Sequence, residues 1–440
     1  MVKMLAAIAV LCAVFSAPAG RAYAAPAADE LSAETSSQPV NQVVQWNRTL
    51  LAIVRTKGAQ PATIHPTRSF AMMHAAIYDA VNAIDGTHKP YLVHITTASP
   101  AASEDAAAAQ SAHDVLVNLY PQSRHALDSQ LKQALAQIPD GTDKDDGVTI
   151  GKTAAAGILG ARTNDGSSAK PPVFVFTRPP VPGDYQSTPP NFPAQPQFTH
   201  WPKVTPFALR SANQFRPGPP PELTSDIYSD DFNEVESLGI AHSIAATPDQ
   251  ALTGKFWNGA IQNYWNEIAQ TAAIDRNLTT AQNARLFALL NLSFADTVIA
   301  FYDAKYTYKF WRPVTAIRAA DTDDNPDTHA DPNWLPEVTN TTPDPSYPGA
   351  HAAISAAGAT VLNSFFFNNK KLDFQVTSEV MPGTVRSFKN FSAAAREATL
   401  SRIFAGVHFR FDLTSGGRLG SEVADFVAGN FLTLANGKRR

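Results

Sequence analysis

The stretch SRIFAGVHFRFD, residues 401–412, places an arginine, a glycine, a histidine and an aspartate at fixed intervals inside an apolar segment. If residues 403–412 are helical, His408 and Asp412 lie one turn apart on the same face. The Asp412 carboxylate can then hold one imidazole nitrogen of His408 and leave the other free, which favours a nucleophile or a metal ligand. The alternative for this stretch alone is a surface His408–Asp412 pair beside the buried stem of Arg402.

Lys305 and Arg312 stand upstream in the sequence KYTYKFWRP, residues 305–313. Lys305 and Arg312 are seven residues apart, so on one helix they share nearly the same face, two turns apart. Pro313 discourages the helix from continuing, which leaves the guanidinium of Arg312 near a helix end and free to swing inward. The pair can grip an oxyanion, and a solvated basic edge is the alternative.

The sequence PDPSYPGAH, residues 343–351, predicts a tight loop that leads into a helix formed by the apolar run 352–367. The free backbone N–H groups and the dipole at such a helix start favour an anion. His351 lies at this position, where imidazole can act as a general acid or base, and the helix start lowers its pKa. A histidine without a chemical role is the alternative.

Combined, these segments supply three permanent cations, a cradle of backbone amides and two imidazoles. The members are Lys305, Arg312, Arg402, the amides of Gly349 and Ala350, His351 and His408. This set fits a tetrahedral or trigonal-bipyramidal oxyanion, because guanidinium groups bind equatorial oxygens while a histidine attacks or ligates axially. Phosphate and vanadate both meet this description.

Three motifs in a fixed order carry a resemblance to a known superfamily. They are Lys305-x6-Arg312-Pro313, then Pro348-Gly349-Ala350-His351, then Ser401-Arg402-x3-Gly406-x-His408-x3-Asp412. This order resembles the signature of the vanadium-dependent haloperoxidase and type 2 phosphatidic acid phosphatase superfamily. The family fold is all-α, and its haloperoxidase branch contains two helical bundles, so the resemblance implies that fold class for this chain.

The resemblance also implies a role for each matching residue. Lys305, Arg312, Gly349, Ala350 and Arg402 would bind the oxygens of vanadate or phosphate, His351 would be the acid or base, and His408 beside Asp412 would be the axial vanadium ligand or phosphate nucleophile. Gly349 and Ala350 stand where the family usually has a serine and a glycine. One hydroxyl hydrogen bond, on the order of 1.5–3 kcal/mol, is therefore missing, and Ser346 is a candidate to replace it.

Two activities can share this pocket, because vanadate has the shape of phosphate in its transition state. The first is a haloperoxidase that oxidises a halide with hydrogen peroxide at vanadate held by His408, and the chain length favours it. Asp344 stands where chloride-oxidising members tend to have an aromatic residue, and a carboxylate repels halide, so we expect bromide rather than chloride. The alternatives are an exported acid phosphatase that forms a phosphohistidine from a phosphomonoester, and a non-catalytic oxyanion-binding scaffold.

The chain divides into five segments. Residues 1–24 resemble a secretory signal and 25–40 a flexible leader, so we expect a periplasmic or secreted protein. Residues 41–169 are predicted to form an N-terminal helical bundle and 223–440 a C-terminal bundle that carries the site. The Pro-rich segment 170–222 is predicted to be a long connector. Helices are expected near 101–119, 121–137, 148–163, 225–238, 248–269 and 280–310.

Composition narrows the possible partners. The chain has 35 Lys and Arg residues, two of them in the signal, against 39 Asp and Glu residues, so the mature chain carries a net charge of about −6. This charge argues against a nucleic-acid partner. Cys12, the single cysteine, lies in the signal, which excludes disulfides and thiolate metal sites from the mature chain. No later stretch reaches about 18 uninterrupted apolar residues, so no integral membrane span is expected.

A short pattern recurs at an offset of 224 residues. Phe70, Ala71, Ala76 and Tyr78-Asp79-Ala80 match Phe294, Ala295, Ala300 and Tyr302-Asp303-Ala304. The match indicates two related helical bundles, and coincidence between two Ala-rich helices is the alternative. In this register Val81 corresponds to Lys305, so the first bundle would lack a site.

Overall fold

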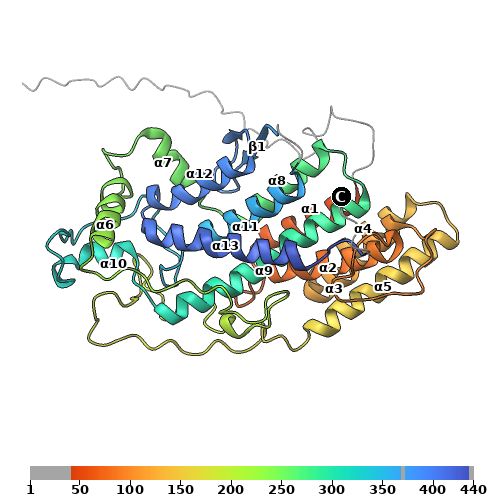
Figure 1. Cartoon of the computed structure of the whole chain (residues 1–440), viewed down its shortest axis with the longest axis horizontal. Coiled ribbons are helices and arrows are strands. Elements are labelled where there is room, and N and C mark those ends of the chain that lie inside the picture. The colour runs from red at the N-terminus through yellow and green to blue at the C-terminus, as the bar shows by residue number, and fades with distance from the viewer. Residues whose placement is uncertain (1–40, 368–371, 436–440) are drawn as a thin grey trace, which may run out of the picture. The chain divides into compact units, whose positions relative to one another are not determined.

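The computed structural model describes residues 41–367 and 372–435, so the predicted signal and leader lie outside the described residues. The described part is mostly helical, with long loops between the helices, which confirms the all-α fold class (Figure 1). The helices are α1 (Gln42–Arg55), α2 (Pro66–Asp85), α3 (Glu104–Leu119), α4 (Arg124–Ala136), α5 (Thr142–Arg162), α6 (Asp226–Leu238), α7 (Pro248–Phe256), α8 (Ile261–Asp275), α9 (Thr280–Tyr308), α10 (Pro313–Arg318), α11 (Ala350–Phe365), α12 (Phe391–Phe404) and α13 (Arg410–Asn430). Short 3-10 turns are η1 (Pro121–Ser123), η2 (Trp201–Lys203) and η3 (Ala320–Thr322).

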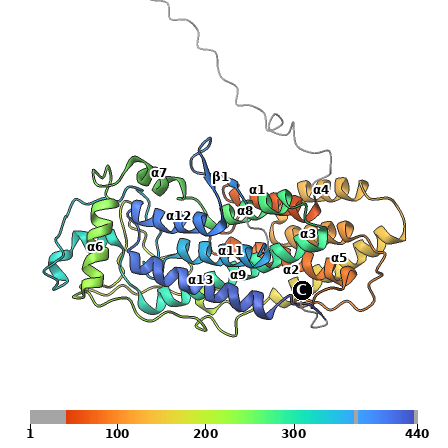
Figure 2. The same ribbon diagram turned by 45° about the horizontal axis from the view of Figure 1, so that its top comes forward.

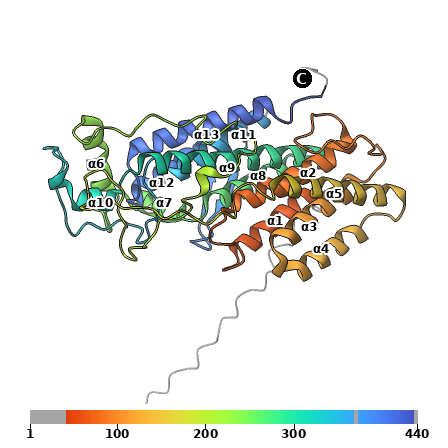
Figure 3. The same cartoon turned by 90° about the horizontal axis from the view of Figure 1, so that it is seen from below.

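The helices form two sets of the same construction. In the first set α2 packs against α3 and α5, and α3 also packs against α1 and α4. In the second set α9 replaces α2, and α8, α11, α12 and α13 replace α1, α3, α4 and α5. Helices α2 and α9 pack against each other (Figures 2 and 3). One hydrophobic cluster extends through both sets. The predicted two helical bundles are therefore present, while the boundaries 41–169 and 223–440 stay a prediction.

Paired glycines show how closely the equivalent helices approach. A Cβ at Gly147 of α5 would lie 2.5 Å from the carbonyl oxygen of Ser103, just before α3. A Cβ at Gly416 of α13 would likewise overlap the carbonyl oxygen of Gly349, just before α11. Only a residue without a side chain permits such backbone contact. In both sets a second glycine four residues later makes the same kind of approach.

One buried aspartate in each set makes the same kind of contact. Asp79 of α2 accepts hydrogen bonds from the backbone N–H groups of residues 91–93, at 2.6 to 3.0 Å. Asp296 of α9 accepts three from residues 207–209, at 2.6 to 2.7 Å. Each carboxylate thus holds three consecutive donors of a segment that crosses its helix, which satisfies backbone groups that burial would otherwise leave unpaired.

If Asp79 of α2 and Asp296 of α9 are equivalent, the two helices correspond at an offset of 217 residues. The predicted offset of 224 is therefore wrong. The error is seven residues, close to two full helical turns, and the same apolar face repeats after that interval. A sequence pattern of small and aromatic residues cannot separate the two registers. In the corrected register Lys305 corresponds to His88 rather than to Val81.

The Pro-rich segment 170–222 contains no α-helix in the structure, only the 3-10 turn η2. Figure 1 shows it as a yellow-green trace. Its aromatic residues Tyr185 and Trp201 are buried. Asp184 forms an isolated β-bridge with Phe310, directly after α9. The segment is therefore fixed against the second set of helices at the point where the candidate site begins.

One local prediction is wrong, and one element has no counterpart among the predictions. The predicted helix 248–269 is two helices, α7 and α8, separated by residues 257–260. The dipeptide Asn258-Gly259 in this gap is a turn signal that the helical pattern had hidden. The chain also forms a small antiparallel hairpin, although strand signals are nearly absent from the sequence. Its strands are β1 (Phe374–Thr377) and β2 (Val385–Phe388), with Phe374 opposite Phe388.

One helix of the described residues, α9, has the length and hydropathy of a membrane span. Of its most apolar window, 94% is buried inside the protein. A central core helix surrounded by other helices has the same composition, because all of its faces contact apolar partners.

Candidate active site

Lys305 and Arg312 approach each other from two different elements. Lys309 adopts a left-handed conformation (φ 50°) that ends α9, and Arg312 is the N-cap of α10. The backbone carbonyl of Lys309 accepts a hydrogen bond from the N–H of Tyr185 in the Pro-rich segment, at 2.7 Å. This contact draws the chain out of the helix, so the expectation of one continuous helix is wrong. Both cations nevertheless reach the same carboxylate, that of Asp344.

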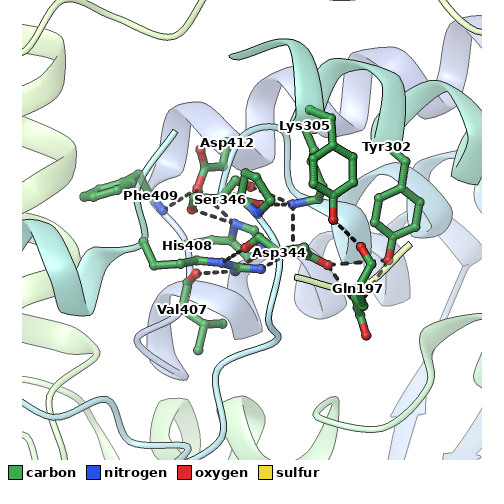
Figure 4. Close-up of polar contacts among 12 residues, drawn as sticks. Gln197, Tyr302, Lys305, Asp344, Ser346, Val407, His408, Phe409 and Asp412 are labelled. Atoms are coloured by element: carbon green, nitrogen blue, oxygen red, sulfur yellow. Dashed lines mark hydrogen bonds and ion pairs between the residues drawn. The ribbon is translucent and has the colours of Figure 1, made fainter. Parts of the chain in front are cut away.

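Asp344 is the buried anion of the site (Figure 4). Its Oδ1 lies 2.5 Å from Nη2 of Arg312 and 3.3 Å from Nζ of Lys305. Its Oδ2 accepts hydrogen bonds from Gln197 at 3.1 Å and from the hydroxyl of Tyr302 at 3.4 Å. Burial opposes ionisation, but the two cations outweigh it and hold the pKa of Asp344 below its ordinary value. Its charge is therefore compensated inside the protein.

The segment that carries His408 is a loop between α12 and α13, so the predicted helix 403–412 is wrong. Gly406 has a φ of 77°, which ends α12. A side chain at this position would overlap the carbonyl oxygen of Gly239 and would lie 2.8 Å from Cβ of Pro336. The glycine is required by its backbone conformation and by this close contact.

The predicted contact between His408 and Asp412 is present, although a different local structure produces it. Asp412 is the third residue of α13, and its Oδ2 accepts the backbone N–H of Phe409 at the helix N-cap, at 3.0 Å. The same oxygen lies 2.9 Å from Nδ1 of His408 and 2.5 Å from Oγ of Ser346. Capping of the helix thus fixes the carboxylate that orients the imidazole.

The contacts of His408 also define its tautomer. Nη1 of Arg312 lies 3.1 Å from Nε2 of His408, and because a guanidinium only donates, Nε2 must accept and carries the lone pair. Nδ1 then carries the proton and donates to Asp412. Burial, followed by the positive charge of Arg312, lowers the pKa of His408 well below its ordinary value. A neutral imidazole with an oriented lone pair suits a metal ligand or a nucleophile.

Asp412 is itself strongly perturbed. Burial raises its pKa to about 7, against the hydrogen bond from Ser346 and the charge of Lys305, which lower it. Its Oδ1 is buried and forms no hydrogen bond within residues 41–367 and 372–435. A carboxyl group that titrates near neutral pH therefore lies directly behind His408.

Arg402 and His351 meet at the gap between α7 and α8. Nη2 of Arg402 donates to Oδ1 of Asn258 at 2.9 Å, and Nη1 lies 3.4 Å from the carbonyl oxygen of Trp257. Nε2 of His351 lies 3.0 Å from the same carbonyl oxygen, which can only accept, so this nitrogen carries the proton. Burial and the charge of Arg402 lower the pKa of His351 well below its ordinary value, the direction predicted from its position at a helix start.

Gly349 and Ala350 form the start of α11. Gly349 is the N-cap, no side chain caps this helix start in the described chain, and its own N–H donates to the carbonyl oxygen of Asp412 at 2.8 Å. A Cβ at Gly349 would lie 3.0 Å from Cδ2 of Leu413. Ser346 points its hydroxyl at Asp412 and lies on the Nδ1 side of the imidazole. It therefore supports the orientation of His408 and does not replace the missing serine.

The structure brings the predicted residues to one site from four helices and the loops between them. They are Lys305, Arg312, Gly349, Ala350, His351, Arg402, His408 and Asp412. Sequence reasoning missed Gln197, Trp257, Asn258 and Tyr302. The Asn258-Gly259 dipeptide could have indicated the break that exposes the Trp257 carbonyl, whereas no local signal links Gln197 to Asp344.

The donor set fits an oxyanion. Arg402 is 3% exposed and has no ion-pair partner among the described residues. Burial, followed by the charge of Arg312, lowers its pKa to about 9, the direction expected for a buried cation that lacks a counter-ion. The described chain holds no group of three or more His, Cys, Asp or Glu side chains suited to a metal cation. A single histidine lone pair among three cations instead suits vanadate or phosphate.

Comparison with known proteins gives a consistent result. The family described as the VCPO second helical-bundle domain matches residues 285–437. Vanadium chloroperoxidase of Curvularia inaequalis is 25% identical over 500 aligned residues, which cover 86% of this chain and 80% of that protein.

Solved structures agree at the level of the whole fold. The crystal structure of the first bacterial vanadium-dependent iodoperoxidase superimposes with a TM-score of 0.77 at 25% identity, over 92% of this chain and 100% of that chain. A holo-type bacterial vanadium-dependent chloroperoxidase has a TM-score of 0.65 at 17% identity, over 89% of this chain and 96% of that chain, which is a likeness of fold. The resemblance to the vanadium-dependent haloperoxidase and type 2 phosphatidic acid phosphatase superfamily, in its haloperoxidase-like branch, is thereby confirmed.

Proposed function

We propose that this protein is an exported vanadium-dependent haloperoxidase that oxidises bromide in preference to chloride with hydrogen peroxide. One observation carries the proposal: Nε2 of His408 presents a lone pair next to Arg312, while Asp412 holds the opposite nitrogen. Export rests on the signal-like residues 1–24.

The residues around this lone pair would have separate roles. Bound vanadate supplies a Lewis acid that activates hydrogen peroxide without a change of oxidation state. His408 would hold it, Asp412 would keep the Nε2 lone pair available, and Arg402 with the backbone N–H groups at the start of α11 would bind its oxygens. The lowered pKa of His351 keeps this imidazole neutral, so its Nδ1 can accept a proton from hydrogen peroxide.

The halide preference follows from the charge of the pocket. Asp344 does not face a halide, because it is buried and paired with Lys305 and Arg312. It instead removes part of the positive charge that would attract a halide. We therefore place chloride, the most difficult of the three common halides to oxidise, behind bromide. Since one structural neighbour is an iodoperoxidase, iodide belongs in the same assay.

The same imidazole geometry suits a second activity. A neutral histidine whose Nε2 carries the lone pair can attack phosphorus and form a phosphohistidine. The leaving oxygen would then take a proton that His351 has first bound at Nδ1. We keep a phosphomonoesterase as the alternative for this reason. The two activities differ in their response to vanadate, which the first requires and which inhibits the second.

The test uses the mature protein with and without orthovanadate. Halogenation is measured with chloride, bromide and iodide, and phosphatase turnover is measured with a phosphomonoester. We expect vanadate-dependent bromide oxidation that is lost in His408→Ala and kept in His125→Ala, a variant of an exposed histidine on α4. Phosphatase turnover that vanadate inhibits would favour the alternative. The absence of both activities would leave an oxyanion-binding scaffold.

A further inference from the structure

Lys305 has no hydrogen-bond donor left for a ligand. An ammonium group has three donors. Nζ of Lys305 contacts the carbonyl oxygens of Pro345 and Ser346, the latter at 3.0 Å, and Oδ1 of Asp344 at 3.3 Å. All three acceptors belong to one loop, residues 344–346, so this loop takes up the whole donor capacity of the lysine.

Arg312 is nearly as fully engaged. Its Nε donates to the backbone carbonyl of Asp344 at 2.8 Å, and its Nη2 donates to the carboxylate of the same residue at 2.5 Å. Its Nη1 reaches the carbonyl oxygen of Val407 at 2.9 Å and Nε2 of His408 at 3.1 Å. Four of the five N–H groups of a guanidinium are thus used.

Asp344 is held from its other side as well. Gln197 and Tyr302 donate to its Oδ2, and the backbone N–H of Gln197 donates to the carbonyl oxygen of Pro343 at 2.8 Å. The hydroxyl of Tyr306 donates to the carbonyl oxygen of Gln197. These contacts tie the loop to α9 and to the Pro-rich segment. The carboxylate is a built part of the site and not a surface group that turned inward.

We propose that Asp344 is a resident counter-anion that occupies the donors of Lys305 and Arg312, so that an incoming oxyanion must compete with it. This inference rests on the proposed oxyanion-binding function of the pocket. Arg402 is the one cation of the three without a carboxylate partner in the described chain, and it offers an oxyanion its first contact. Asp344 therefore weakens the binding of a doubly charged oxyanion more than that of a singly charged one, because it repels each unit of negative charge.

The test compares Asp344→Asn with wild type in the binding of two tetrahedral probes near pH 7. Orthovanadate at low micromolar concentration is mainly a monoanion, and molybdate is a dianion. A unit charge at roughly 6 Å in an effective dielectric of about 20 changes the affinity for a monoanion about a hundredfold, and the logarithm of the effect doubles for a dianion. We expect tighter binding of both probes, with the larger gain for molybdate.

Asp165→Asn is the matched control. The side chains of Asp165 and Asp344 are each at most 4% exposed. Asp165 is paired with Arg68 and Arg162 in the first set of helices. Its replacement also leaves two buried cations without a carboxylate, and we expect it to leave both affinities at the wild-type value. Equal or weaker oxyanion binding by Asp344→Asn overturns the inference while the function stands. Wild-type binding by His408→Ala overturns the function instead.

The stability of Asp344→Asn supplies a second measurement. This variant leaves Lys305 and Arg312 buried without a carboxylate, which should destabilise the folded protein. It is purified with and without molybdate, and its melting temperature is measured in both conditions. Folding that requires molybdate, or a melting temperature that rises more steeply with molybdate than that of wild type, supports the inference. A variant that melts at one temperature in both conditions overturns it.

Discussion

Gly416 offers a test of whether the contact between α13 and α11 positions the candidate site. An alanine at this position would place Cβ under 3.0 Å from the carbonyl oxygen of Gly349, a distance that real Cβ atoms do not show. The obstacle is backbone at the start of α11, so no side chain can rotate away. The two helices must separate by roughly 1 Å to restore an ordinary contact. That shift would displace His351, two residues after Gly349.

The magnitude combines two opposing effects. Overpacking of a tight contact costs about 1–3 kcal/mol, and we take the upper value because backbone is the obstacle. Replacing glycine by alanine inside a helix stabilises the helix by about 1 kcal/mol. Gly416→Ala should therefore lose about 2 kcal/mol in the free energy of unfolding. A displacement of about 1 Å at a catalytic group costs roughly a hundredfold in rate.

Two other glycines supply the controls. Gly417, the next residue of α13, has open space where its Cβ would be, so Gly417→Ala should gain about 1 kcal/mol and keep activity. Gly147 makes the same backbone contact in the first set of helices, away from the site. Gly147→Ala should lose stability and keep activity.

The assays are urea unfolding, orthovanadate binding and bromide oxidation, each relative to wild type. Of the three variants, only Gly416→Ala should lose both stability and activity. If Gly416→Ala and Gly147→Ala lose stability equally and both keep wild-type vanadate affinity, the contact supports the fold without positioning the site, and the reasoning fails.

Three further predictions concern the site itself. The pKa of Asp412 in the folded protein, about 7, lies above its ordinary 3.8, so its contribution to stability is complete below pH 3.8 and is lost as the pH rises to about 7. In urea unfolding from pH 4 to 8, the free energy of unfolding of the wild type should fall by up to about 1.4 kcal/mol per pH unit, a fall that Asp412→Asn lacks. Equal slopes of this free energy against pH in the two proteins would contradict the prediction. Gly349→Ser should tighten orthovanadate binding about tenfold or more, because the hydroxyl adds a charge-assisted hydrogen bond. Its Cβ would lie 3.0 Å from the flexible side chain of Leu413 and 3.3 Å from the carbonyl oxygen of Asp412, contacts that a shift of a few tenths of an ångström relieves. Unchanged affinity in a titration would show that the hydroxyl does not reach the ligand. Asn258→Ala removes the acceptor that orients Arg402 and should weaken orthovanadate binding up to about tenfold, and an unaltered dissociation constant would assign the orientation to the carbonyl of Trp257.

Local chemistry could be predicted from the sequence where neighbouring residues determine it. The pair His408 and Asp412 is four residues apart, so the carboxylate reaches the imidazole whether the segment is one helix or a loop followed by a capped helix. The helical pattern could not distinguish these two cases, because the left-handed Gly406 that ends α12 is required by a distant contact with Gly239. The prediction was right about the contact and wrong about the backbone that makes it.

Features that depend on distant segments could not be predicted. The charge of Asp344 is neutralised by Lys305 and Arg312, and its other oxygen is held by Gln197, which lies 147 residues away in the Pro-rich segment. Hydrophobic periodicity carries no information about such a pairing. A carboxylate near a predicted halide site was therefore interpreted as exposed to the ligand, whereas the structure shows it bound to the cations.

The two aspartates that hold crossing segments differ in one respect that bears on folding order. Asp79 binds residues 12 to 14 positions along the chain, whereas Asp296 binds residues 87 to 89 positions away. Closing the longer loop costs about 1.7 kcal/mol more in chain entropy. The first set of helices can therefore complete its crossing early, and the Pro-rich segment docks late. Since that segment brings Gln197 to Asp344, the candidate site should be among the last parts of the protein to form.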